Sequence, residues 1–279
     1  VLGSIKNGLG FKNGDSVSVL NINGQNGILV DKKLDETGIV VPTIESYGNT
    51  NITNANTNSG VVVDGVIKTS NGNTTITNDG SMGVSIAGTI DSELGNVSIT
   101  NSGVNGTKIT GLITNTAENI SITNDAGKLT IFGTVQNQGK DLLITNNGDA
   151  GAEISGLVSN SGTASTITIN NTKGALNITE TAIVQNNSQL KEDNMKISNS
   201  GEGLLSILGK VLNIGKGNTV VDNTNTASGA VVAGTVKNNQ GNISIDNNGN
   251  SGITLKNTAL VENAGGNLSI DNKNINSGI

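Results

Sequence analysis

The stretch Val97-Ser98-Ile99-Thr100-Asn101 decides the fold, because variants of it recur along most of the chain. Each copy alternates apolar with polar residues, ends in Asn, and is separated from the next copy by 22 to 28 residues. Alternation with a period of two predicts a β-strand in every copy. The ten terminal asparagines are Asn54, Asn78, Asn101, Asn124, Asn146, Asn171, Asn199, Asn223, Asn247 and Asn272.

A second block, Ile-x-Gly-x-Ile or Ile-x-Gly-x-Val, follows each of these asparagines by nine to eleven residues. Ile86-Ala87-Gly88-Thr89-Ile90 is an example, and at Glu180 and Asn257 the Gly is replaced and one residue is added. This block also alternates with the strand period. Turns rich in Asn and Gly, which adopt the positive φ angles of tight turns, connect the blocks.

A unit of about 24 residues with two or three short strands cannot bury its apolar face alone, so neighbouring units must stack. The sequence therefore predicts an all-β fold, a parallel β-solenoid with about one coil per 24 residues. Roughly eleven to twelve coils at a spacing of about 4.7–4.9 Å would make a rod on the order of 55 Å long. The residues expected to form one inward column are Ile76, Ile99, Ile122, Ile144, Ile169, Ile197, Val221, Ile245 and Ile270.

We expect one solenoid segment over residues 1–279, with insertions at 31–47 and 187–194. The first insertion is charged and holds the only Pro and the only Tyr, Pro42 and Tyr47. The second, which contains Lys191-Glu192-Asp193, accounts for the single 28-residue spacing between motif asparagines.

Both ends of the chain match parts of the repeat. Residues 1–7 match the second block as it stands at 232–238, and residues 276–279 match the entry to that block at 58–61. Residues 13–30 fit one more coil. We therefore expect the chain to begin and end in mid-coil, as a segment cut from a longer chain.

The composition excludes several functional classes. The chain has no Cys, His or Trp, and all sixteen basic residues are Lys. It therefore lacks an imidazole base, a thiol nucleophile, the usual zinc ligands and the bidentate phosphate clamp that Arg provides. A net charge of −6 argues against a nucleic-acid partner. No apolar run approaches the ~20 residues of a membrane helix, so we expect no membrane insertion in this segment.

Tandem coils of this length, rich in Asn, Gly, Thr and Ile, resemble the repeat region of large secreted bacterial adhesins. The closest resemblance is to the filamentous-haemagglutinin-type exoproteins of two-partner secretion, followed by autotransporter passengers. The resemblance implies a right-handed parallel β-helix, export from a Gram-negative cell and a location outside the cell or on its surface. It also implies a structural shaft that displays adhesive or effector parts to a host or neighbouring cell.

Three alternatives remain. The first is a self-assembling extracellular filament or surface-layer subunit, in which copies of the chain stack end to end. The second is a polysaccharide-active enzyme, which would need clustered carboxylates with Arg or Lys in a cleft. The acidic residues are scattered, so we expect no enzyme. The third is ice binding, suggested by an outward double column of Thr and Ser that is broken by Leu143, Lys196 and then Asp. Its members are Thr53, Thr77, Thr100, Thr123 and Thr145, with Thr75, Ser98 and Ser121 two residues before the corresponding Thr.

Two of the repeated columns are candidate sites. The motif asparagines are expected to form a structural ladder, because stacked buried amides can hydrogen-bond from coil to coil. Asp222, Asp246 and Asp271 precede three consecutive motif asparagines. Carboxylates stacked in this way repel one another unless a cation or a Lys neutralises them, so they are a candidate Ca²⁺ site. The alternative is a solvated acidic face, and no other cofactor is predicted.

Sequons of the type Asn-x-Ser/Thr also recur at a fixed place in the repeat. Some adhesins of the resembled family are glycosylated at such sequons, although an Asn before an alternating strand produces the sequence automatically. Many sequons occur in the chain, among them those that begin at Asn51, Asn73, Asn96, Asn119, Asn177, Asn242 and Asn267. The five expected at exposed turns, and taken as candidate glycosylation sites, are Asn73, Asn96, Asn119, Asn242 and Asn267.

Overall fold

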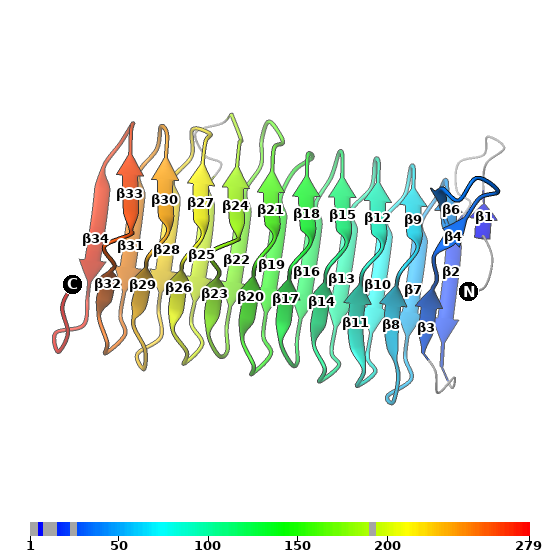
Figure 1. Cartoon of the computed structure of the whole chain (residues 1–279), viewed down its shortest axis with the longest axis horizontal. Helices are drawn as coiled ribbons and strands as arrows, with labels where there is room; N and C mark the ends of the chain where they lie inside the picture. Colours follow the sequence, from blue (N-terminus) through cyan, green and yellow to red (C-terminus); the bar gives the residue numbers. More distant parts are fainter. Residues whose placement is uncertain (1–4, 8–15, 23–26, 190–193) are drawn as a thin grey trace.

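The computed structural model describes residues 5–7, 16–22, 27–189 and 194–279, and within these ranges the chain forms 34 strands and no helix. The strands lie side by side along a rod, with the two ends of the chain at its opposite ends (Figure 1). They form three long parallel sheets, here named A, B and C, and one small hairpin. The predicted fold, an all-β parallel solenoid with coils of about 24 residues, is confirmed.

Sheet B contains the motif that ends in Asn. Its strands are β2 (Val17–Asn21), β7 (Thr50–Asn54), β10 (Thr74–Asn78), β13 (Val97–Asn101), β16 (Ile120–Asn124), β19 (Leu142–Asn146), β22 (Ile167–Asn171), β25 (Met195–Asn199), β28 (Thr219–Asn223), β31 (Ile243–Asn247) and β34 (Leu268–Asn272).

Sheets C and A follow sheet B in each coil. The strands of sheet C are β3 (Ile28–Val30), β8 (Gly60–Val63), β11 (Gly83–Ile86), β14 (Thr107–Ile109), β17 (Leu129–Ile131), β20 (Ala152–Ile154), β23 (Leu176–Ile178), β26 (Leu205–Ile207), β29 (Ala230–Val232) and β32 (Ile253–Leu255). Those of sheet A are β1 (Ile5–Asn7), β6 (Ile44–Ser46), β9 (Val66–Thr69), β12 (Thr89–Ser92), β15 (Leu112–Asn115), β18 (Thr134–Asn137), β21 (Leu157–Asn160), β24 (Ile183–Asn186), β27 (Lys210–Asn213), β30 (Thr235–Asn238) and β33 (Leu260–Asn263).

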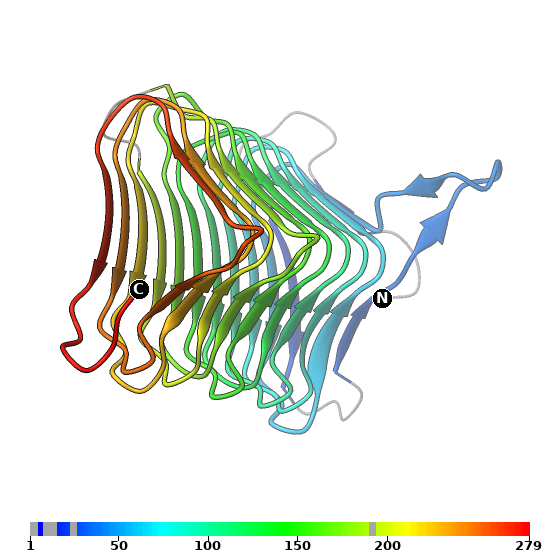
Figure 2. The same ribbon diagram turned by 60° about the vertical axis from the view of Figure 1, so that its left-hand side comes forward.

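Each coil is triangular in cross-section, with one sheet on each side (Figure 2). Equivalent residues are in register: Ile76 pairs with Ile99, which pairs with Ile122. The predicted inward column is buried, with side chains 0–1% exposed from Ile76 to Ile245. Only Ile270, on the last strand of sheet B, is half-buried. The core is therefore a stack of small aliphatic layers inside the triangle.

The second sequence block is a corner rather than a single strand. In the example around Gly88, strand β11 ends at Ile86 and β12 begins at Thr89, so the block spans sheets C and A. A Cβ on Gly88 would collide with the carbonyl oxygen of Gly65 in the preceding coil. Glycine is needed here because successive coils approach each other backbone to backbone. The block alternates with the strand period on both sides of this corner, which conceals the bend.

The first insertion is shorter than the predicted range 31–47. Strands β4 (Lys33–Leu34) and β5 (Val40–Val41) form an antiparallel hairpin that projects from the rod (Figure 2). The next strand, β6, is already regular, because Ile44 is fully buried and pairs with Ile67 of sheet A. The insertion therefore ends before Ile44. In the second insertion, predicted at 187–194, residues 190–193 lie outside the described ranges.

The predicted coil near the N-terminus is present as β2 and β3, although residues 13–15 and 23–26 of its range 13–30 are not described. Strand β1 lies in the same sheet as β30, as the match between residues 1–7 and 232–238 predicts, while residues 1–4 are not described. Among the described residues, no helix is long and apolar enough to cross a membrane.

Candidate functional site

The motif asparagines lie in a single buried column inside the rod. Each is the last residue of a sheet B strand, and from Asn54 to Asn247 the side chains are 0–1% exposed. The Nδ2 of each donates a hydrogen bond to the Oδ1 of the Asn in the next coil, over 2.6–3.1 Å. The column includes one member outside the predicted ten, Asn21, which donates to Asn54 over 2.7 Å. All of these bonds run in the same direction along the axis.

The amides of this column also close the turn that follows each strand. Asn101 Nδ2 donates to the carbonyl of Gly103 over 3.1 Å, and Asn101 Oδ1 accepts the Gly103 N–H over 3.1 Å. Together with the bonds from Asn78 and to Asn124, these contacts use both amide protons and both lone pairs. An amide whose donors and acceptors are all used has no group left to bind a ligand. The column therefore has a structural role.

A second buried amide column lies at the ends of the sheet A strands, and sequence reasoning missed it. Asn115 Nδ2 donates to the Asn119 carbonyl over 2.8 Å, and Asn115 Oδ1 accepts the N–H groups of Ala117 and Glu118. The signal was present, since these residues follow the second block by a fixed offset, as in Ile113-Thr114-Asn115. The members are Asn115, Asn137, Asn160, Asn186, Asn213, Asn238 and Asn263.

The outward face of sheet B carries the predicted Thr column. Thr77 pairs with Thr100, and the register continues through Thr123 to Thr145. These side chains are half-buried between their neighbours. In the later coils Asn170, Ser198 and then the three aspartates take the same position. Ice binding by this face stays a prediction.

The Asp column is in register but does not have the form of a metal site. Asp222 pairs with Asp246, and Asp246 pairs with Asp271. Nevertheless, the described residues include no group of three or more acidic side chains that could hold a metal ion. Ser244 Oγ donates to Asp246 Oδ2 over 2.8 Å, and Lys273 Nζ lies 3.8 Å from Asp246 Oδ1. A hydroxyl and a Lys thus already contact the central carboxylate, and Ca²⁺ binding by this column stays a prediction.

We expect that a chelator will leave the thermal unfolding of this protein unchanged. A bound ion would raise the melting temperature according to RT ln(1 + [L]/Kd), and nothing in the Asp column gathers the ligands that such an ion needs. The measurement is a melting curve with added Ca²⁺ and with excess chelator. A Ca²⁺-dependent rise that disappears when Asp222, Asp246 and Asp271 are all changed to Thr would instead confirm the calcium hypothesis.

The candidate glycosylation asparagines form a third column, at the turn between sheets A and B. Asn73 Oδ1 accepts the N–H of Asn96 over 2.8 Å, and Asn242 Oδ1 accepts the N–H of Asn267 over 2.8 Å. Asn73, Asn242 and Asn267 are exposed, whereas Asn96 and Asn119 are half-buried and donate through Nδ2. Of the remaining sequon asparagines, Asn51 lies on β7 and Asn177 on β23. Glycosylation stays a prediction.

Ion pairs on the surface join neighbouring coils. Lys68 Nζ lies 3.1 Å from Glu93 Oε1, and Lys237 pairs with Glu262 over 3.0 Å. The hydrogen bond and charge of Glu93 raise the pKa of Lys68, and the nearby charges of Asp91 and Glu45 act in the same direction. Exposed pairs of this kind each contribute only about 0–1 kcal/mol to stability. They balance charge along the rod rather than build a site.

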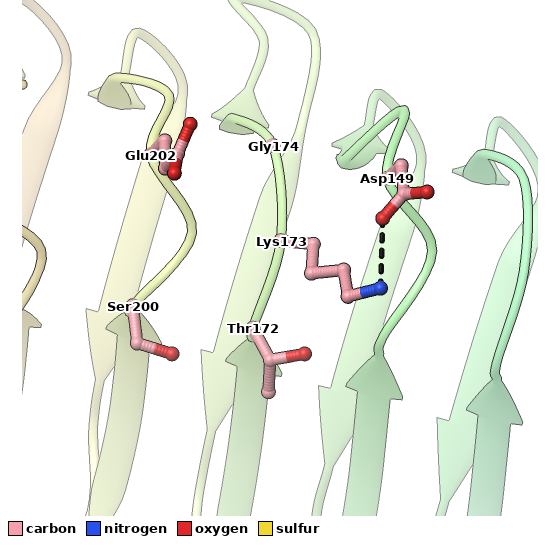
Figure 3. A pocket seen from close by; sticks show the side chains of 6 residues that line it. All are labelled: Asp149, Thr172, Lys173, Gly174, Ser200 and Glu202. Atoms are coloured by element: carbon pink, nitrogen blue, oxygen red, sulfur yellow. Dashed lines mark ion pairs between the residues drawn. The ribbon is translucent and has the colours of Figure 1, made fainter.

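A polar hollow on the turns between sheets B and C gathers charged side chains from three successive coils (Figure 3). Lys173 Nζ lies 2.8 Å from Asp149 Oδ1, and Glu202 lies on the next turn. Thr172, Gly174 and Ser200 complete the lining. The Asp149 side chain is 87% exposed, so water screens the charges here. Sequence reasoning did not single out these residues.

We find no match for this chain among models of protein families, curated proteins or solved structures.

Proposed function

We propose that this chain is a structural shaft segment of an exported bacterial surface adhesin or exoprotein, holding adhesive or effector parts away from the cell. The observation that carries the proposal is the continuity of the stack. Sheets A and B each run through eleven strands in register, and a buried amide column follows the same path. A shaft needs this continuity, because each coil must transmit mechanical force to the next coil.

The chemistry of the rod also supports a structural role outside the cell. The coils are joined by backbone hydrogen bonds on three sides and by an aliphatic core, and the chain contains no Cys. Stability therefore does not depend on the redox state of the compartment. The outer surfaces carry many Thr, Ser, Asn and charged side chains, which favours solubility of a long, thin body.

A deletion by whole coils tests the modular stack that a shaft requires. Removing residues 79–124 joins Asn78 to Asp125 at equivalent points of the repeat and takes out two coils. We expect a folded protein that is shorter by about 10 Å in solution scattering, because each coil adds one strand spacing. The matched control removes residues 79–112, so that a sheet B strand runs directly into sheet A. This variant should lose its strand signal in circular dichroism.

The shaft role itself is tested by displaying the chain between a membrane anchor and a fluorescent reporter on a Gram-negative cell. We expect the reporter to lie about 50 Å farther from the membrane than when it is fused directly to the anchor, as energy transfer to a membrane dye can measure. The purified chain should show no saturable binding to host cells. Saturable binding by the chain alone would contradict the shaft, and long end-to-end fibres in electron microscopy would favour the filament alternative.

A further inference from the structure

Three buried oxygen atoms without a hydrogen-bond partner occur at one corner of the rod. They are Asn186 Oδ1, Asn213 Oδ1 and Thr219 Oγ1, and all three residues are 0% exposed. Asn186 and Asn213 end the neighbouring strands β24 and β27 and pair in register. Thr219 begins β28, the next strand along the chain. This corner, where sheet A turns into sheet B, is here called the 186/219 corner.

Most other members of the sheet A amide column have donors that these two lack. Asn137 Oδ1 accepts the N–H of Gly139, and Asn238 Oδ1 accepts the N–H groups of Gln240 and Gly241. The backbone that follows each Asn normally supplies this donor. Asn263 Oδ1 also lacks a partner, but it lies on the last strand of sheet A, at the end of the stack. The two unpaired amide oxygens at the 186/219 corner, in contrast, lie in the interior of the stack.

The longer turn after β24 places Ser188 at this corner. Ser188 is fully buried, and its Oγ accepts the N–H of Ser165 over 3.3 Å. Its carbonyl accepts the N–H of Lys216 over 3.2 Å. Lys216 is the third residue after Asn213. In the Asn238 coil the equivalent residue is Gly241, and its N–H donates to Asn238 Oδ1. The N–H of Lys216 is therefore engaged by the preceding coil, as is that of Lys140, the third residue after Asn137.

The fold brings the three oxygens to the same corner. Asn186 and Asn213 lie one strand spacing apart, about 4.8 Å. Asn213 and Thr219 occupy the positions that Thr69 and Thr74 occupy in another coil, the last residue of sheet A and the first of sheet B. The hydroxyls of Thr69 and Thr74 are 2.8 Å apart. A small molecule bound between the coils can therefore contact atoms at the end of β27 and at the start of β28.

We propose that the 186/219 corner binds one ordered water molecule as part of the folded structure. A buried polar atom left unpaired costs about 1–3 kcal/mol, and buried waters typically make about three hydrogen bonds to such atoms. One water donates its two protons to Asn186 Oδ1 and Asn213 Oδ1 and accepts the proton of the Thr219 hydroxyl. Donors and acceptors then balance. A metal ion fits less well, because it leaves that hydroxyl proton unused and finds only three neutral oxygens.

The variant Thr219→Val tests the water through the sign of its effect. If the corner is dry, the change removes an unpaired hydroxyl and raises the melting temperature. If the water is bound, the change removes one of its hydrogen bonds, and we expect the melting temperature to fall by about 2–4 °C. The matched control is Thr74→Val, which removes a direct hydroxyl bond at the same strand position and should also lower the melting temperature. A raised or unchanged value for Thr219→Val overturns the proposal.

A crystal structure of the full chain gives a second measurement that does not depend on the variant. We expect one density peak about 2.7–3.2 Å from each of the three oxygens. Crystals soaked in rubidium should show no anomalous signal at this peak. An anomalous peak would identify a monovalent cation site in place of water, and the absence of any peak would show a dry corner. Either result overturns the proposal.

Discussion

Replacing Ile122 with Asp is expected to unfold the coils around β16. Ile122 lies in the middle of the inward column, is 0% exposed, and is paired with Ile99 on one side and Ile144 on the other. The variant removes an aliphatic side chain from a close-packed layer and places a carboxylate where no partner exists. We expect a loss of about 5 kcal/mol or more in the free energy of unfolding. Circular dichroism and a melting curve measure it.

The neighbouring position supplies the control for this prediction. Thr123→Asp introduces the same carboxylate on the outward face of the same strand, at the position that Asp222, Asp246 and Asp271 occupy in later coils. We expect it to fold with a melting temperature close to that of the parent. If Ile122→Asp were as stable as Thr123→Asp, the inward assignment of the motif would be wrong.

Breaking the buried amide column at its centre is expected to have the second-largest effect. Asn101→Leu keeps the approximate size of the side chain but removes its donors and acceptors. Asn78 Nδ2 then loses the acceptor of one of its two protons, 2.8 Å away in the parent. Asn124 Oδ1 loses the donor 2.9 Å away but keeps the hydroxyl of Thr107. The N–H of Gly103 also loses its partner, whereas the Gly103 carbonyl keeps the N–H of Gly106. At about 1–3 kcal/mol for each unpaired buried group, the loss is several kcal/mol.

The control is Asn105→Leu, a change of the same chemistry on the exposed turn between sheets B and C. We expect denaturant unfolding to show a large shift of the midpoint for Asn101→Leu and a small one for Asn105→Leu. Hydrogen exchange should also increase in the coils next to Asn101. Equal midpoints for the two variants would show that the column is not required for stability.

The candidate sites show which features of the rod a repeated residue pattern can predict. The motif asparagines were identifiable because the same residue recurs at the end of an alternating strand, which sets both its burial and its stacking. The sheet A amides recur just as regularly, but Ser46, Thr69 and Ser92 replace Asn in the early coils and conceal the column. The Asp column was found in register, yet the compensation of Asp246 by Lys273 involves a turn whose path the sequence does not specify.

The sequence alone determined the repeat, the inward aliphatic column and the stacking of coils. Alternation over five residues can bury only one face of a strand, and a unit of about 24 residues cannot bury that face without neighbours. Tertiary structure alone decided the corner at Gly88, the common direction of the amide bonds and the insertion of Ser188 beside Asn213. These features depend on how closely the backbones of adjacent coils approach, a distance set by all three sheets together rather than by any one segment.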